Sequence, residues 1–298
     1  MGVGDDAAVL RVPDGRVVAT TDMLIEGRHF RREWSCAADI GRKAAARNFA
    51  DVAAMGAVPT ALLVGFAGPG ELPANWVREL AAGIASECSV AGAKVAGGDT
   101  SRADLVLLSI TALGDLGGAA PVTRGGARPG DVVAVAGSLG GAAAGLALLR
   151  AGASLAGSPV LAGLVNAHRR PRPPYAAGPR AAQLGASSMI DVSDGLIADL
   201  GHVADASGVG IELATAPLTA STVADAGALR QAASVLGLAD WIPWVLTGGD
   251  DHALVATFPP GVHLPADWTE VGKVAKGHGV VIDGKIWTGA GGWDHFRS

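Results

Sequence analysis

The sequence predicts an α/β (α+β) protein built from two domains. Three observations lead to this expectation: the chain has 298 residues, helix-like and strand-like segments alternate in both halves, and a turn-rich stretch separates the halves. That stretch, residues 123–130, reads Thr-Arg-Gly-Gly-Ala-Arg-Pro-Gly. We therefore expect domains at 1–126 and 127–298. The residues alone do not decide between parallel and antiparallel pairing of the strands.

The first half reads as strands and helices in alternation. Residues 39–55 are rich in Ala, with Asp39 placed to act as an N-cap and Gly56 near the C-cap. Pro73 suits the first turn of a second helix. Residues 94–96 lead into a glycine-rich cluster. We expect strands at 17–21, 60–66 and 105–113, and helices at 39–55 and 73–91.

The second half repeats this style. We expect strands at 131–136, 188–192, 209–213 and 253–258, helices at 141–150 and 196–206, and a rigid Arg- and Pro-rich connection at 168–180. Residues 132–149 carry no charge and are long enough to raise the question of a membrane span. Glycines interrupt this segment at four positions, so a strand, a turn and a helix describe it better.

The net charge and the cysteine content limit the classes of protein to which this chain can belong. The formal net charge is −5, which argues against a nucleic-acid partner because such binding relies on basic surfaces. Two cysteines, Cys36 and Cys88, make neither a disulfide framework nor a zinc pattern and fit a reducing compartment. The first residues do not read as a secretory signal. We expect a cytoplasmic protein with no nucleic-acid or membrane partner.

Five short acidic clusters are the most informative feature. Aspartate is a poor strand former, so its repeated placement beside strand-like apolar runs needs a reason. Hard oxygen ligands in this number suit Mg²⁺, which binds through carboxylates, waters and substrate phosphates. We expect one site assembled from distant segments. The clusters read Gly4-Asp5-Asp6, Thr20-Thr21-Asp22, Gly97-Gly98-Asp99-Thr100-Ser101, Asp191-Val192-Ser193-Asp194-Gly195 and Gly248-Gly249-Asp250-Asp251.

Two of the acidic positions also have a simpler interpretation. Arg47 lies four residues before Asp51 on the expected helix, so the two could form a solvated ion pair. Beside the other clusters we favour Asp51 as a metal ligand. Asp191 ends an expected strand, and Ser193 and Asp194 either cap the next helix or place an anion and its metal at the helix N-terminus.

Other motifs narrow the chemistry. The glycines before Asp99 would let the backbone approach a phosphate, but no Gly-Lys-Ser/Thr follows, so this is not a Walker loop. Residues 137–141 lack the spacing of a dinucleotide fingerprint. His29 is either a surface residue or a substrate contact, and we favour the latter because it follows a proposed metal cluster. No nucleophile arrangement stands out, and phosphoryl transfer needs none.

In this order, these clusters and their flanking motifs resemble the thiamine-monophosphate kinase family, part of the ATP-binding superfamily that includes aminoimidazole ribonucleotide synthetase. Any one motif is weak, but the ordered set is specific and covers nearly the whole chain. The Asp-His-Phe ending helps to separate this family from its relatives. The motifs lie at residues 2–10, 20–30, 48–57, 97–101, 123–131, 190–202, 247–251 and 293–296.

The resemblance implies a fold and an activity. Each domain would be a mixed sheet covered by helices, with the first binding ATP and Mg²⁺ and forming a homodimer, and the second completing the active site. The reaction would be direct in-line, Mg²⁺-assisted transfer from ATP to thiamine monophosphate, without a phospho-enzyme. The acceptor phosphate has a second pKa near 6, so it is already anionic and needs no general base.

The resemblance also assigns roles residue by residue. Trp293 would offer a flat face for stacking and for cation–π attraction to the thiazolium ring. The carboxylates expected to act in catalysis through bound Mg²⁺ are Asp22, Asp51, Asp99 and Asp191. The implied Mg²⁺ ligands are Asp6, Thr20, Thr21, Asp22, Asp51, Asp99, Asp191 and Asp194; the ATP contacts are Gly98, Asp99, Arg124 and Ser193; and the thiamine-phosphate contacts are His29, Asp250 and Trp293.

Three features depart from the family pattern. Members usually carry some two dozen residues before the first cluster, so either the start is misassigned or the nucleotide site is less enclosed. Asp250 stands where Glu is usual, and His252 where Tyr is usual. We expect these changes to affect substrate affinity more than the type of reaction. The alternatives are another enzyme of the superfamily, or a non-catalytic paralogue that binds Mg²⁺ and nucleotide.

Overall fold

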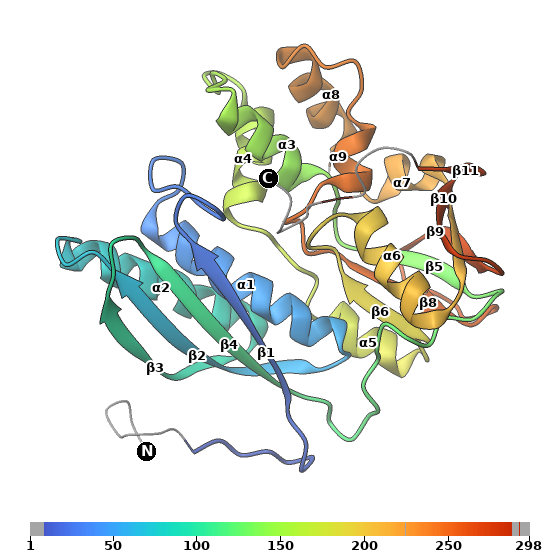
Figure 1. The fold of residues 1–298 in the computed structure, drawn as a ribbon, viewed down its shortest axis with the longest axis horizontal. Helices are drawn as coiled ribbons and strands as arrows, with labels where there is room; N and C mark the ends of the chain where they lie inside the picture. The colour runs from blue at the N-terminus through green and yellow to red at the C-terminus, as the bar shows by residue number, and fades with distance from the viewer. Residues whose placement is uncertain (1–8, 224, 288–291, 293–298) are drawn as a thin grey trace.

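The computed structural model describes residues 9–223, 225–287 and 292, and contains two mixed sheets with helices packed against them (Figure 1). The first sheet has the strand order β1-β4-β2-β3, in which β2 and β3 are parallel and the other neighbours antiparallel. The elements of this half are β1 (Val18–Ile25), α1 (Ala37–Ala54), β2 (Val58–Gly68), α2 (Ala74–Ala91), β3 (Lys94–Arg102) and β4 (Leu107–Asp115).

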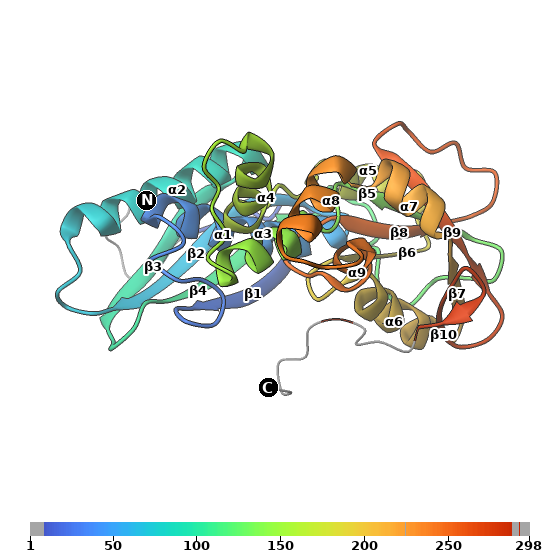
Figure 2. The same cartoon turned by 90° about the horizontal axis from the view of Figure 1, so that it is seen from above.

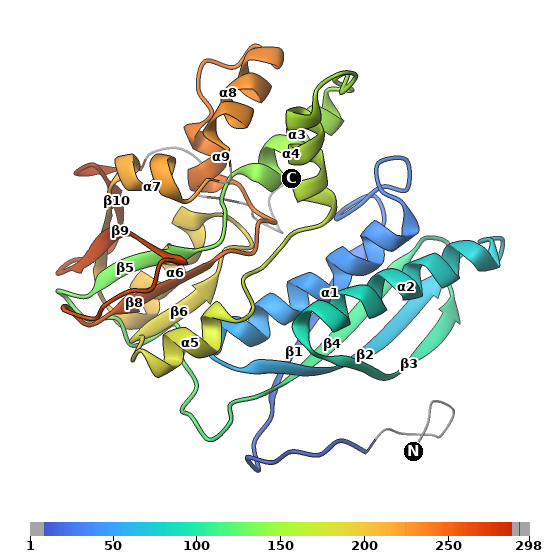
Figure 3. The same cartoon turned by 180° about the vertical axis from the view of Figure 1, so that it is seen from behind.

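Both helices of this half cover the same face of the sheet. Figure 3 shows α1 and α2 in front of the strands, whereas Figure 1 shows the strands in front. Side chains alternate between the two faces of β4, and the buried ones, Leu108, Ile110 and Ala112, join a core with Phe49 of α1. No described helix covers the opposite face, where Met23 and Leu63 are exposed.

The second half forms a seven-stranded sheet with the order β11-β10-β7-β9-β5-β8-β6. Its neighbours are antiparallel except β7 and β10, which are parallel. The elements are β5 (Val132–Ala136), α3 (Gly141–Arg150), α4 (Pro159–Arg169), α5 (Ala177–Gln183), β6 (Ser188–Asp191), α6 (Leu196–Ser207), β7 (Gly210–Leu213), α7 (Thr215–Ser221), α8 (Ala226–Val235), α9 (Ile242–Thr247), β8 (Leu254–Phe258), β9 (Trp268–Ala275), β10 (Gly279–Ile282) and β11 (Lys285–Ile286). The expected class of two mixed sheets with helices is therefore confirmed.

Helix α1 joins the two halves, which lie side by side when seen from above (Figure 2). It contacts its own sheet and α2, and also α4, α5 and β6 of the second half. Gly178 of α5 allows one of these contacts, because a Cβ built there would lie 2.0 Å from the carbonyl oxygen of Ala53. The helix is therefore buried on nearly all sides, and its polar residues face groups of both halves. Among the described residues, no helix is long and apolar enough to cross a membrane.

Several expected boundaries are wrong. Strand β1 continues through Asp22 to Ile25, and β3 contains the Gly97–Ser101 cluster, so both clusters lie within strands. The N-cap of α1 is Cys36, and Asp39 lies in the first turn, where its carboxylate pairs with Arg170. The sequence did not indicate the short elements α4, α5, α7, α8, α9, β9, β10 and β11.

Candidate active site

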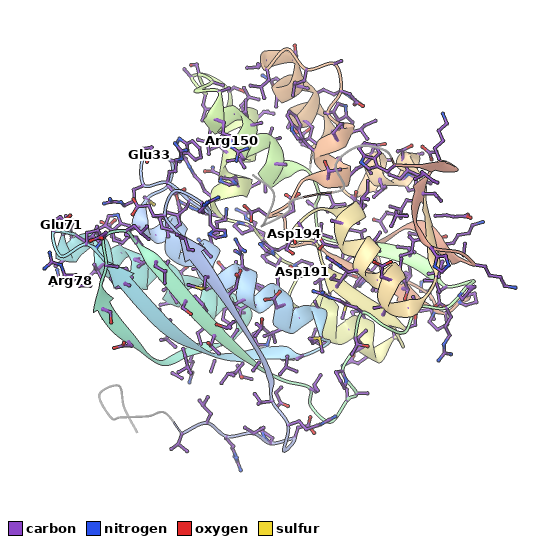
Figure 4. The ribbon with its side chains drawn as sticks, in the orientation of Figure 1. Glu33, Glu71, Arg78, Arg150, Asp191 and Asp194 are labelled. Carbon is purple, nitrogen blue, oxygen red and sulfur yellow. The ribbon has the colours of Figure 1, made fainter. Side chains whose placement is uncertain are left out.

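A cavity of about 430 Å³ lies where β1 and α1 meet the second half of the chain. Figure 4 labels two of its acidic residues, Asp191 and Asp194, which lie at this junction. A second cavity of about 460 Å³, between α3, α4 and α8, contains none of the predicted site residues. The first cavity is lined by Thr20, Thr21 and Asp22 of β1, Arg47 and Asp51 of α1, Arg124 of the connection, and Asp191, Ser193, Asp194 and His252 of the second half.

Asp51 is one of the carboxylates that line this cavity. Its Oδ2 accepts a hydrogen bond from the Thr20 hydroxyl at 3.0 Å. Burial raises the pKa of Asp51 to about 7, and the negative charge of Asp191 adds to the effect. Asp191 Oδ2 lies 3.0 Å from Nδ1 of His252, whose side chain is 2% exposed. Carboxylates this close, away from water, favour the binding of a cation.

A second acidic group lies at the N-terminus of α6. Asp199 Oδ2 accepts hydrogen bonds from the backbone N–H groups of Asp194, at 3.1 Å, and Gly195, at 3.0 Å. The N-cap of α6 is Gly195, so neither Ser193 nor Asp194 occupies the N-cap position. Burial, together with the negative charges of Asp191 and Asp194, raises the pKa of Asp199 to about 8.

A charged cluster extends the site toward the start of α1. Lys43 Nζ lies 2.9 Å from Asp250 Oδ2 and 3.4 Å from the carbonyl oxygen of His29, so it bridges two predicted substrate contacts. Arg47 pairs with Asp22 Oδ2, through Nε at 2.8 Å and Nη2 at 2.7 Å. Burial opposes ionisation of Asp250, but Lys43 and Arg47 outweigh it and hold the pKa of that carboxyl well below its usual range.

Burial lowers the pKa of His29, and the positive charge of Arg47 lowers it further. The Nδ1 atom of His29 accepts a hydrogen bond from the backbone N–H of Ile25 at 3.0 Å. This contact fixes the tautomer, with the proton on Nε2. A neutral His29 can therefore donate a hydrogen bond from Nε2 to a bound ligand.

The structure gathers most of the predicted residues but not all. Thr20, Thr21, Asp22, Asp51, Arg124, Asp191, Ser193 and Asp194 line one cavity. His29 and Asp250 adjoin it through Lys43 and Arg47. The simpler alternative for Asp51, a solvated ion pair with Arg47, does not form, because Arg47 binds Asp22 instead. Asp6 and Trp293 lie outside the described residues.

Gly98 and Asp99 are not part of this cavity. They lie on β3, three strands away from β1, a distance of roughly 14 Å. Asp99 pairs with Gly65, and the row continues through Ser109 to Met23, all on the face opposite α1. Gly98 also has a structural reason to be glycine, since a Cβ there would lie 2.0 Å from the carbonyl oxygen of Val64.

Sequence reasoning missed two cations of the site. Lys43 and Arg47 both face the acidic residues, and each is largely buried. Their spacing was the available signal: Lys43, Arg47 and Asp51 are four residues apart, so they share one face of α1. A buried helix face that carries two cations and a carboxylate is unusual and indicates a functional site.

The donor set fits Mg²⁺, although the site is not a preformed cage. Among the described residues, no group of three or more His, Cys, Asp or Glu side chains is arranged to hold a metal ion. Mg²⁺ generally binds through one or two carboxylates and completes its shell with waters and substrate phosphates. The carboxylate and hydroxyl oxygens of Thr20, Asp22 and Asp51 suit this mode of binding.

Comparisons with known proteins identify the family. The model of the AIR synthase related protein N-terminal domain matches residues 4–116, and that of the C-terminal domain matches residues 128–235. Thiamine-monophosphate kinase from Mycobacterium tuberculosis (strain CDC 1551 / Oshkosh) is 49% identical over 297 residues, covering 99% of this chain and 86% of the relative. The chain belongs to the thiamine-monophosphate kinase family of AIR synthase related proteins. The membership predicted from the motifs is confirmed.

Two further matches agree with this assignment. The thiamine-monophosphate kinase of Corynebacterium glutamicum is 41% identical over 299 residues, covering 98% of this chain and 88% of the relative. The solved structure of AaThiL complexed with AMPPCP and TMP superposes with a TM-score of 0.86 at 33% identity, covering 98% of this chain and 91% of AaThiL. Family membership and fold therefore extend over both halves of the chain.

Proposed function

We propose that this protein transfers the γ-phosphoryl group of ATP to the phosphate of thiamine monophosphate, forming thiamine diphosphate and ADP. One observation carries the proposal: a thiamine-monophosphate kinase matches 99% of the chain at 49% identity. The cavity adds independent support, because it collects acidic and hydroxyl side chains from both halves.

The transfer is direct. An oxygen of the acceptor phosphate attacks the γ-phosphorus, the bond to the β–γ bridging oxygen breaks, and its electron pair leaves with ADP. Two unit charges 4 Å apart interact by roughly 4 kcal/mol at an effective dielectric constant near 20, so the two polyanions repel each other strongly. Bound Mg²⁺ supplies the neutralising charge. The protein then needs only to position the two substrates.

The nucleotide, the acceptor and the metal each have their own set of residues. Arg124 and Ser193, with Gly98 and Asp99, contact ATP. His29 and Asp250, with Trp293, contact thiamine monophosphate. The metal ligands are Thr20, Thr21, Asp22, Asp51, Asp191 and Asp194, which line the cavity, together with Asp6 and Asp99. Asp22, Asp51, Asp99 and Asp191 act in catalysis through the metal.

Asp99 reaches a site by dimerisation. It lies on the open face of the first sheet, where Met23 and Leu63 are 43% and 37% exposed. An apolar sheet face of this kind is suited to pack against a second copy of itself about a two-fold axis. The first domain, residues 1–126, would form this homodimer and bring Asp99 to the cavity of the partner.

Mixed dimers test the contribution of Asp99. Asp51→Asn and Asp99→Asn are each expected to lose turnover, but an equal mixture that exchanges subunits should regain about a quarter of the wild-type rate. The reason is that half of the dimers are mixed, and one site in each is intact if Asp99 acts in the partner. No recovery in mixed dimers would place Asp99 in its own subunit's site or nowhere.

Turnover tests the main proposal. The protein is incubated with ATP, Mg²⁺ and thiamine monophosphate, and thiamine diphosphate is measured. Nucleotide binding without product would favour the alternative, a non-catalytic paralogue, and product from another phosphate acceptor would favour another enzyme of the superfamily. Both described cysteines are free, which fits the cytoplasmic location that we infer for this reaction.

A further inference from the structure

Arg47 occupies a position between the two parts of the site. It extends from α1 into the cavity, and its side chain is only 10% exposed. One edge of its guanidinium binds Asp22, a proposed metal ligand, at 2.7 and 2.8 Å. Its Nη1 lies 3.5 Å from Oδ1 of Asp250, a proposed substrate contact. The guanidinium therefore spans the gap between the metal ligands and the acceptor site.

The charges in this row alternate. Asp250 is negative, Arg47 positive and Asp22 negative, and Lys43 offsets the charge of Asp250 at 2.9 Å. Burial alone would lower the pKa of Arg47, but Asp250 and Asp22 together raise it. A guanidinium is in any case charged throughout the physiological pH range. Among the described residues, Arg47 forms ion pairs with Asp22 and Asp250. Both of these carboxylates are also proposed to contact a ligand, Asp22 the metal and Asp250 the substrate.

The two substrates carry the complementary order of charge. In a complex, the thiazolium cation would face Asp250, the acceptor phosphate would come next, and Mg²⁺ would lie on Asp22. We propose that Arg47 binds the phosphate of the acceptor substrate, and that its ion pair with Asp22 is a resting contact that the metal replaces. This inference rests on the proposed function and adds a phosphate-binding residue to the same site.

The contacts on the two oxygens of Asp22 explain why such an exchange would take place. Asp22 Oδ2 accepts both contacts from Arg47, and Asp22 Oδ1 accepts the backbone N–H of Met23 at 2.7 Å. A metal ion that binds Asp22 through Oδ2 therefore competes with the guanidinium. Once displaced, Arg47 presents a planar fork of donors that matches a phosphate. The metal thus competes with Arg47 for Asp22. Once the metal has displaced Arg47, that side chain is available to bind the phosphate.

The variant Arg47→Gln distinguishes the binding of phosphate by Arg47 from its competition with the metal for Asp22. The variant should bind thiamine monophosphate roughly 10- to 100-fold more weakly than wild type, as expected for loss of a charge-assisted hydrogen bond. It should bind Mn²⁺, used as the spectroscopic probe for the metal, about threefold to tenfold more tightly, because the competing cation is gone. Binding of thiamine, which has no phosphate, should change less than twofold.

The binding measurements are made by calorimetry and by Mn²⁺ electron paramagnetic resonance, without nucleotide and hence without turnover. Arg47→Lys keeps the charge and should recover part of the phosphate affinity. Arg42→Gln is the matched control, because Arg42 lies on the same helix but pairs with Glu87 at 3.2 Å, outside the cavity. It should leave all three affinities as in wild type.

Two results would overturn the inference. One is an Arg47→Gln variant that binds thiamine monophosphate as tightly as wild type; the other is an equal loss of affinity for thiamine and thiamine monophosphate, which indicates a purely structural role. If Arg47→Gln does not fold, Arg47→Lys decides by the same comparison. A wild-type protein that neither binds nor phosphorylates thiamine monophosphate would instead overturn the proposed function, and this inference with it.

Discussion

Replacing Asp51 by Asn should stabilise the protein without metal and at the same time abolish its response to Mg²⁺. The carboxyl of Asp51 is buried near Asp191, and its pKa is raised from 3.8 to about 7. The folded-state pKa lies above the unfolded value, so between pH 4 and pH 7 the folded protein retains a proton that the unfolded chain has released. Stability from this group therefore falls as the pH rises.

The magnitude follows from the linkage. Each pKa unit corresponds to about 1.4 kcal/mol, so ionised Asp51 destabilises the folded state at pH 8 by on the order of 2–4 kcal/mol. Asn removes the charge and keeps one oxygen to accept the hydroxyl of Thr20. We expect Asp51→Asn to raise the free energy of unfolding by on the order of 2–4 kcal/mol at pH 8, and by less at pH 5, where Asp51 is already protonated.

Denaturant unfolding at pH 5 and pH 8, with and without Mg²⁺, measures these effects. Mg²⁺ at 100 times its dissociation constant should stabilise the wild type by about 2.7 kcal/mol and Asp51→Asn much less. Asp39→Asn is the control on the same helix: Asp39 is buried and pairs with Arg170, so this variant should lose stability at both pH values and keep the Mg²⁺ response. The reasoning fails if Asp51→Asn is less stable than wild type at pH 8 and still gains the full stabilisation from Mg²⁺.

Three further predictions address the substrate site, the pH dependence and the contact between the halves. Asp250→Glu lengthens the side chain by one methylene and should leave the Michaelis constant for thiamine monophosphate equal or lower; a large rise would show that the role assigned to this position by the family resemblance is wrong. Burial lowers the pKa of His168 to about 3, so the unfolded chain binds the extra proton and stability should fall by up to about 1.4 kcal/mol per pH unit on acidification below pH 6.5. His168→Asn should reduce that slope in denaturant unfolding, whereas His263→Asn, at an exposed position, should not. Gly178→Ala places a Cβ 2.0 Å from the carbonyl oxygen of Ala53 and should lower the free energy of unfolding by roughly 1–3 kcal/mol, measured in the same way; an unchanged value would mean that α5 moves freely against α1.

The sequence predicted those elements whose pattern is local. Helix α2 begins after Pro73 and ends at a left-handed Gly92, and α3 has the bounds that were expected from its glycine and Ala-rich run. Strands β2, β5 and β8 are short apolar runs, and each was recognised within two residues at either end. Each of these elements has its own pattern of apolar side chains, so residue propensity and periodicity are enough to predict it.

Prediction failed where distant contacts decide the conformation. The cluster Gly97–Ser101 was expected to follow residues 94–96 as a phosphate-binding segment but forms part of β3, because β2 pairs with it along its whole length. Asp22 reads as a strand end but lies inside β1, paired with Ile110, because its carboxylate binds Arg47 of α1. Aspartate and glycine disfavour strands only slightly, and a continuous ladder of hydrogen bonds outweighs that preference.

The same division applies to the site. The acidic residues and their flanking glycines are apparent in the sequence, and the ordered motifs are enough to indicate the family. The sequence did not indicate that Lys43 and Arg47 neutralise Asp250 and Asp22, since each of these partners lies at least 25 residues away along the chain.

By itself, the sequence determined the family, the two-sheet α/β class and the kind of ligand that the acidic clusters favour. These properties depend on the type and order of the residues, which can be read directly from the sequence. The tertiary structure decided which carboxylates share a cavity, which are paired with cations, and that Asp99 faces away from the others. Such pairings depend on the distance and burial of charges, and folding sets both by packing α1 between the two sheets.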